Sequence, residues 1–178
     1  LLSQMTVEEK LGYIGGIDWM YTKSIDRLGI HRMRMSDGPQ GIGTKGKSTA
    51  YPATVTLAAT WNENLAYQYG KALGRDCRAR NINVILGPAV NIYRAPMCGR
   101  NFEYMGEDPY LTSRICVGYI KGVQDQGVMA TVKHFVANNS DYDRNNISND
   151  IDERTLNEIY FPAYKAAIQE AEVGAIMT

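Results

Sequence analysis

Short apolar runs alternate with longer amphipathic segments along this chain. Most of the short runs are apolar at nearly every position and are bounded by Gly, Pro or polar residues, as strands buried on both faces are. The pattern predicts strands over residues 33–35, 53–57, 82–86, 128–132 and 173–177.

The longer segments carry helix signals. Helices are predicted over residues 6–15, 62–80 and 110–126, and a fourth begins at residue 152. Thr6 and Glu9 have the spacing of a capping box, and Asn62 is a favourable N-cap residue. Pro162 must kink or divide the fourth helix, because proline removes a backbone donor from the helix ladder.

Strands that alternate with helices predict an α/β fold with a parallel sheet, and both a doubly wound sheet and a barrel fit the pattern. No linker or internal repeat divides the chain, so we expect one cooperative unit. A complete eight-fold barrel takes about 250 residues, whereas this chain has 178 and ends on a predicted strand. We therefore expect it to be part of a longer polypeptide.

Composition narrows the classes of partner. The 19 Lys and Arg residues balance the 19 Asp and Glu residues, so we expect no nucleic acid and no anionic membrane as partner. No apolar run approaches the roughly 20 residues of a membrane span. Cys77, Cys98 and Cys116 form no metal-binding or disulfide pattern. We expect these thiols and Trp61 in the core, and neither a metal site nor a cofactor.

Polar residues follow several predicted strands, at the edge where parallel α/β folds bind ligands. Asp37 follows the first strand, the pair Lys133 and His134 follows another, and Arg100 lies in a long loop. A charged pair directly after five apolar residues needs polar partners. Asp37 can accept hydrogen bonds while Arg100, Lys133 and Arg144 donate them, which suits a polyol such as a sugar. A purely structural alternative pairs Arg100 with Glu103 and leaves Lys133 and Arg144 exposed.

Several of these residues lie in longer motifs. They include Ser36-Asp37-Gly38-Pro39, Gly99-Arg100-Asn101-Phe102-Glu103 and Lys133-His134-Phe135. Together with segments 87–96, 106–110, 152–156 and 174–178, they resemble in order the motifs of glycoside hydrolase family 3, the β-glucosidase type. Such an ordered set covers nearly the whole chain and is far more specific than any one motif.

The resemblance implies that residues 1–178 are the N-terminal part of a (β/α)8 TIM-like barrel, incomplete in this chain, with the rest of the barrel and an α/β sandwich domain absent from the sequence. It implies a retaining, exo-acting β-glucosidase that removes terminal β-D-glucosyl residues by double displacement. The implied sugar-binding residues are Asp37, Arg100, Lys133, His134 and Arg144. Both catalytic carboxyl groups lie beyond Thr178 in the family's order, so no catalytic residue is expected here. At least one cis peptide bond is implied around His134.

The implied partners are a β-glucoside or cello-oligosaccharide substrate and the remainder of the same enzyme, and a homodimer is left open. β-Xylosidase or arabinofuranosidase activity of the same family is an alternative, as is a non-catalytic sugar-binding chain. The segment Gly41–Ser48 fits the P-loop pattern of nucleotide-binding proteins. That pattern needs a strand before it and a helix that opens at Lys47 and Ser48, and neither is predicted there.

Overall fold

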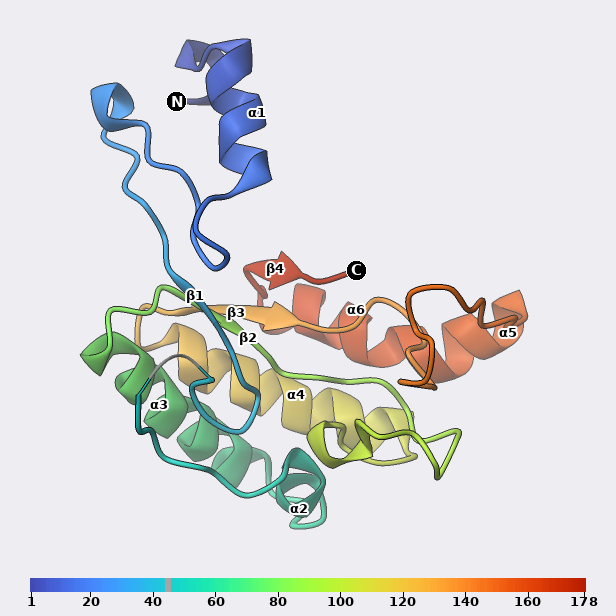
Figure 1. Cartoon of the computed structure of the whole chain (residues 1–178). Helices are drawn as coiled ribbons and strands as arrows, with labels where there is room; N and C mark the ends of the chain where they lie inside the picture. The colour runs from blue at the N-terminus through green and yellow to red at the C-terminus, as the bar shows by residue number, and fades with distance from the viewer. Residues whose placement is uncertain (44–45) are drawn as a thin grey trace.

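A parallel sheet of four strands forms the centre of the computed structural model, which describes residues 1–43 and 46–178 (Figure 1). The strands lie side by side in chain order. Their bounds are Met35–Asp37 for β1, Val84–Leu86 for β2, Met129–Val132 for β3 and Ala175–Ile176 for β4. Asp37 is in register with Leu86, and Val132 with Ile176, so the carboxyl ends of the strands meet at one edge.

The long helices lie together on one face of this sheet. Figure 1 shows α3 (Glu63–Ala79), α4 (Pro109–Gln124) and α6 (Phe161–Gln169) along the same side. A doubly wound sheet reverses its strand order, whereas consecutive strands with an outer layer of helices are typical of a βα-barrel. The predicted α/β class is confirmed, and the topology favours the barrel of the two alternatives.

Helices α3 and α4 pack closely because glycines on each helix face the other. A Cβ atom on Gly70 would lie 2.2 Å from the carbonyl oxygen of Tyr119, and one on Gly122 would lie 2.1 Å from that of Tyr67. Only glycine permits this approach. The surrounding core, between the helices and beneath the sheet, includes Leu73, Cys77, Ile85, Ile115, Ile120, Val123, Ala130 and Val132.

The predicted helix starts are confirmed by their caps. The backbone N–H of Glu9 donates to the Thr6 hydroxyl at 3.2 Å, and the Glu9 carboxylate accepts the Thr6 N–H at 2.9 Å. This capping box opens α1 (Val7–Gly15). At the start of α3, the Asn62 side chain accepts the N–H of Leu65 at 2.9 Å.

The helix predicted from residue 152 is divided, as Pro162 requires. Asp152 caps α5 (Glu153–Thr155), a π-helical turn follows over Leu156–Tyr160, and α6 continues from there. Pro162 lies in the first turn of α6, where its missing N–H costs no intrahelical hydrogen bond.

The predicted strand over residues 53–57 is wrong, because Thr54–Ala58 form the short helix α2. The buried Thr54 hydroxyl donates to the carbonyl oxygen of Glu103 at 2.6 Å, and Leu57 and Ala58 are buried in the core. These tertiary contacts outweigh the strand preference of the β-branched residues.

Trp61 is also placed differently from the expectation, since it is 69% exposed. It lies in the turn between α2 and α3, with a left-handed φ of 53°. The three cysteines do lie in the core, as predicted, and none is bridged. Burial raises the pKa of the Cys77 thiol to about 12.

The N-terminal segment extends away from the sheet. Helix α1 stands apart in Figure 1 and has no buried residue, and short 3-10 turns cover Leu2–Gln4 and Asp26–Leu28. The segment rejoins the sheet where Met35 N–H donates to Met20 O at 2.8 Å. Within the described residues, no helix is both long and apolar enough for a membrane span, and no cluster of His, Cys, Asp or Glu is arranged to hold a metal ion.

Candidate functional site

Two oppositely charged side chains meet at the carboxyl edge of the sheet. Asp37 is the last residue of β1, and Lys133 directly follows β3. The Lys133 ammonium lies 3.5 Å from an Asp37 carboxylate oxygen, and the two side chains are 2% and 62% exposed. The buried ammonium therefore has the partner that its desolvation requires, while the carboxylate still faces outward.

A second carboxylate contacts Lys133 from the loop after β2. Glu103 lies in the 3-10 turn Asn101–Glu103, and its side chain is 4% exposed. Its carboxylate lies 3.7 Å from Lys133 Nζ and accepts a hydrogen bond from Arg100 Nε. Asp37, Arg100, Glu103 and Lys133 thus form one charge network, in which two cations balance two carboxylates.

His134 borders the charge network as an uncharged ring. Burial, and after it the positive charge of Arg100, lowers the pKa of His134 to about 3. The ring packs edge-on against Tyr104, with 6.4 Å between the ring centroids. Its Nδ1 is buried and has no hydrogen-bond partner among the described residues. A neutral imidazole donates from one ring nitrogen and accepts at the other.

A hollow of about 470 Å³ opens beside His134. Arg100 and Arg144 both line it, and Arg144 is held by Asp141, with 2.6 Å between the guanidinium and the carboxylate. The volume falls in the range of about 300–1,000 Å³ that is usual for small-molecule sites. The Lys133–His134 and Phe135–Val136 peptide bonds beside it are cis, which confirms the expectation for this segment.

A second hollow, of about 530 Å³, borders Asp37. Trp19 lines it from a tight turn, at which Ile17 and Tyr21 exchange backbone hydrogen bonds of 2.8 and 3.1 Å. Trp19 is 92% exposed. Next to a carboxylate, an exposed indole offers a flat apolar surface on which a sugar or another ring can stack.

These groups together match the hydrogen-bonding needs of a polyol. Asp37 accepts hydrogen bonds, the arginines donate them, and the neutral His134 ring does both. Both carboxylates of the charge network lie close to the Lys133 ammonium, at 3.5 and 3.7 Å. The network is suited to holding a polyol.

The structure places the predicted site residues in two sets that share Arg100. Asp37, Arg100 and Lys133 belong to the charge network, and Arg100, His134 and Arg144 line the hollow of about 470 Å³. The alternative pairing of Arg100 with Glu103 exists as well, but Lys133 is buried rather than exposed. The sequence analysis missed that Glu103 also contacts Lys133. The signal was present, since a buried lysine requires nearby carboxylates and Glu103 is the acidic residue of the Arg100 motif.

The P-loop pattern over Gly41–Ser48 includes residues 44 and 45, which lie outside the described residues. Strand β1 ends at Asp37, and the next helix begins only at Thr54. The strand and helix that a nucleotide-binding loop needs at its two ends are therefore not found in the described flanks.

The sequence profile of the glycosyl hydrolase family 3 N-terminal domain matches residues 10–178. The chain belongs to glycosyl hydrolase family 3. It is 48% identical to a β-glucosidase of Bacteroides ovatus and 43% identical to thermostable β-glucosidase B of Acetivibrio thermocellus, in each case over 99% of this chain. It spans 25% of the length of each of these relatives.

Solved family 3 structures share the fold. A Kluyveromyces marxianus β-glucosidase in complex with glucose superimposes with a TM-score of 0.96 at 40% identity, over 99% of this chain and 22% of that one. Thermotoga neapolitana β-glucosidase 3B in complex with α-D-glucose superimposes with a TM-score of 0.91 at 36% identity, over 98% of this chain and 28% of that one. The fold is thus the N-terminal part of the TIM-like barrel of family 3, as predicted.

Proposed function

We propose that this chain forms the sugar-binding part of a β-glucosidase active site. The observation that carries the proposal is the charge network at the carboxyl ends of β1 and β3, with a hollow beside it. Asp37 ends one of these strands, and the buried Lys133 pairs with it at 3.5 Å. The names of the relatives support this function, and so do neighbouring family 3 structures that hold glucose.

Each of the predicted residues has a distinct role in this proposal. Asp37 accepts hydrogen bonds from adjacent hydroxyl groups of the glucosyl residue through its two carboxylate oxygens. Arg100, Lys133 and Arg144 donate to the hydroxyl oxygens, and the neutral His134 ring, which lines the hollow, completes the set.

The proposed reaction is exo-acting hydrolysis of terminal, non-reducing β-D-glucosyl residues with retention of configuration. Such a reaction uses a nucleophilic carboxylate and a carboxylic acid about 5 Å apart. We assign both groups to parts of the enzyme outside this chain. On this assignment, the chain binds and orients the sugar and does not cleave it alone.

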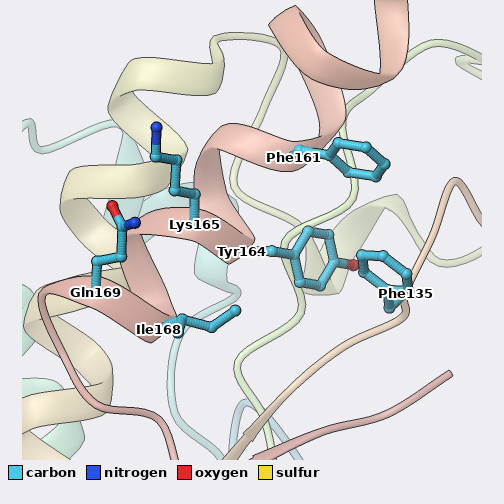
Figure 2. A pocket seen from close by; sticks show the side chains of 6 residues that line it. All are labelled: Phe135, Phe161, Tyr164, Lys165, Ile168 and Gln169. Atoms are coloured by element: carbon cyan, nitrogen blue, oxygen red, sulfur yellow. The ribbon is translucent and has the colours of Figure 1, made fainter. Parts of the chain in front are cut away.

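The remainder of the same enzyme is the proposed partner, and it completes the barrel and adds the α/β sandwich domain. An apolar face beside β4 supports this: Phe135 stacks on Phe161 with 5.7 Å between centroids, and Tyr164 packs edge-on against Phe135 at 5.1 Å. Figure 2 shows Ile168 extending toward these rings, and Lys165 extending away from them. These side chains line a hollow of about 260 Å³ that further barrel elements can fill.

Replacing Asp37 in the complete enzyme tests the proposed function. We expect Asp37→Ala to lower kcat/KM for an aryl β-glucoside by about 100-fold or more, because hydrogen bonds to a charged group contribute about 1.5–3 kcal/mol each. Asp26→Ala, at an exposed aspartate of the N-terminal segment, is the matched control and should leave kcat/KM unchanged. Equal activity of the two variants would refute the proposed role of Asp37. A preference for the aryl β-xyloside or arabinofuranoside would refute the glucosidase specificity.

A further inference from the structure

Glu103 is the most deeply buried carboxylate of the charge network, and it touches both cations. The whole residue is 3% exposed. Its carboxylate accepts a hydrogen bond from Arg100 Nε and lies 3.7 Å from the Lys133 ammonium. An ionised carboxylate is buried at this depth only when its partners compensate for lost hydration. Glu103 is therefore fixed by the same two cations that the proposed function directs toward the sugar.

The backbone around Glu103 is held as firmly as its side chain. The Thr54 hydroxyl of α2 donates to the Glu103 carbonyl oxygen at 2.6 Å, and the Gln40 side chain donates to the carbonyl oxygen of Phe102 at 3.0 Å. The Glu103 N–H donates to Arg100 O at 3.1 Å, which closes the 3-10 turn. A carboxylate on such an anchored turn provides a fixed reference point for the flexible side chains that bind it.

The geometry leaves the terminal nitrogens of Arg100 available to a ligand and holds the Lys133 ammonium between two carboxylates. Glu103 occupies Nε of Arg100, and the two terminal guanidinium nitrogens, which carry the other four N–H donors, can serve a ligand. The Lys133 ammonium lies between a buried carboxylate and an exposed one, at 3.7 and 3.5 Å. The buried carboxylate can offset positive charge without using the exposed carboxylate of Asp37.

We propose that Glu103 is a positioning residue of the sugar site: its carboxylate orients Arg100 and Lys133 and balances their charge, so that Asp37 keeps its oxygens for sugar hydroxyls. This inference rests on the proposed function. Glu103 itself touches no substrate and takes no part in proton transfer. Without its carboxylate, Lys133 turns to Asp37 as its sole acidic partner in the network, and Arg100 loses the contact that sets its direction.

The test is Glu103→Gln in the complete enzyme, assayed with an aryl β-glucoside and its mono-deoxy analogues. We expect kcat/KM for the parent glucoside to fall about 10- to 100-fold, as for other misplaced binding groups. For the analogue that lacks the hydroxyl bound by Arg100 or Lys133, the loss should be at least about threefold smaller, because that contact is already missing. A residue with only a structural role would lower activity on every analogue by the same factor, and that result would overturn the proposal.

Two further variants make the outcome decisive. Glu107→Gln changes an exposed glutamate of the same loop and should match the unaltered enzyme on all substrates. Glu103→Asp keeps the charge, so it should recover part of the lost kcat/KM, and it supplies the same comparison if Glu103→Gln does not fold. Full activity of Glu103→Gln beside an inactive Asp37→Ala would defeat this inference alone. Full activity of both variants would defeat the proposed function itself.

Discussion

The burial of His134 links the chemistry of the site to the stability of the protein. Burial and nearby positive charge lower its pKa from 6.5 to about 3, so the folded protein keeps the ring neutral throughout the range near neutral pH. The unfolded chain has no such environment. Between these two pKa values, the unfolded state therefore binds a proton that the folded state does not, and stability rises with pH across this interval.

We predict that His134→Asn removes this pH dependence. Above pH 6.5 the histidine is neutral in both the folded and the unfolded state, so it does not change the free energy of unfolding. As the pH falls from 6.5 toward 3, the unaltered protein should lose stability that the variant keeps. The measurement is the urea midpoint of both proteins in a series from pH 4 to 7, with His31→Asn, at an exposed histidine, as the control. Parallel curves for His134→Asn and the unaltered protein would contradict the prediction.

The site residues differ in how far the sequence alone could locate them. Asp37 and Lys133 come at the ends of apolar strands, so the sheet itself brings them to one edge, and the strand pattern was sufficient. Arg100 and Arg144 lie in irregular loops whose course no periodicity encodes, so their residue types and the motif resemblance, and not the strand pattern, pointed to them. The exposed Trp19 beside Asp37 depends on pairing between Met20 and Met35, which is not visible in the local sequence.

At the scale of elements, caps and long apolar stripes were reliable, and one short β-branched segment, 53–57, was assigned wrongly. The capping signals at Thr6 and Asn62 act within a few residues and so could be read directly. The segment 53–57 has the composition of a strand, but burial of Thr54 against Glu103 makes it a helix. Strand β1 begins at Met35 and not at Met33 as predicted, because Met33 pairs with the antiparallel segment near Thr22.

The contact between α3 and α4 gives a prediction about stability. Alanine is a better helix former than glycine by about 1 kcal/mol, yet the added methyl group of Gly70→Ala would meet a backbone carbonyl at 2.2 Å. Overpacking lowers stability by about 1–3 kcal/mol. We expect a cost at the upper end for Gly70→Ala, because the atom that the methyl group would meet belongs to the rigid backbone. We expect a net loss of about 2 kcal/mol in the free energy of unfolding, measured by chemical denaturation. Gly15→Ala, with nothing within 4 Å, should cause no loss, and equal stability of the two variants would contradict this packing argument.

At the scale of the whole molecule, we propose that the chain provides one side of a larger structure. Its strands run in chain order with helices on one face, and it spans 25% of the length of the relatives compared above. The apolar face around Phe135 and Phe161 lies beside β4, since the N–H of Phe135 donates to the carbonyl oxygen of Met177 at 2.7 Å. We propose that further barrel elements pack against this edge. The proposed sugar site lies at the strand ends, where residues from this chain and from the remainder of the enzyme can meet around one ligand.

The most direct test is a structure of the complete enzyme with glucose bound. We predict a single glucose at the carboxyl ends of β1 and β3, with Asp37 accepting hydrogen bonds of about 3 Å from two adjacent hydroxyl groups. Arg100, Lys133 and His134 should contact the same ring. Glucose held elsewhere in the barrel, with no hydroxyl within hydrogen-bonding distance of Asp37 or Lys133, would contradict the account.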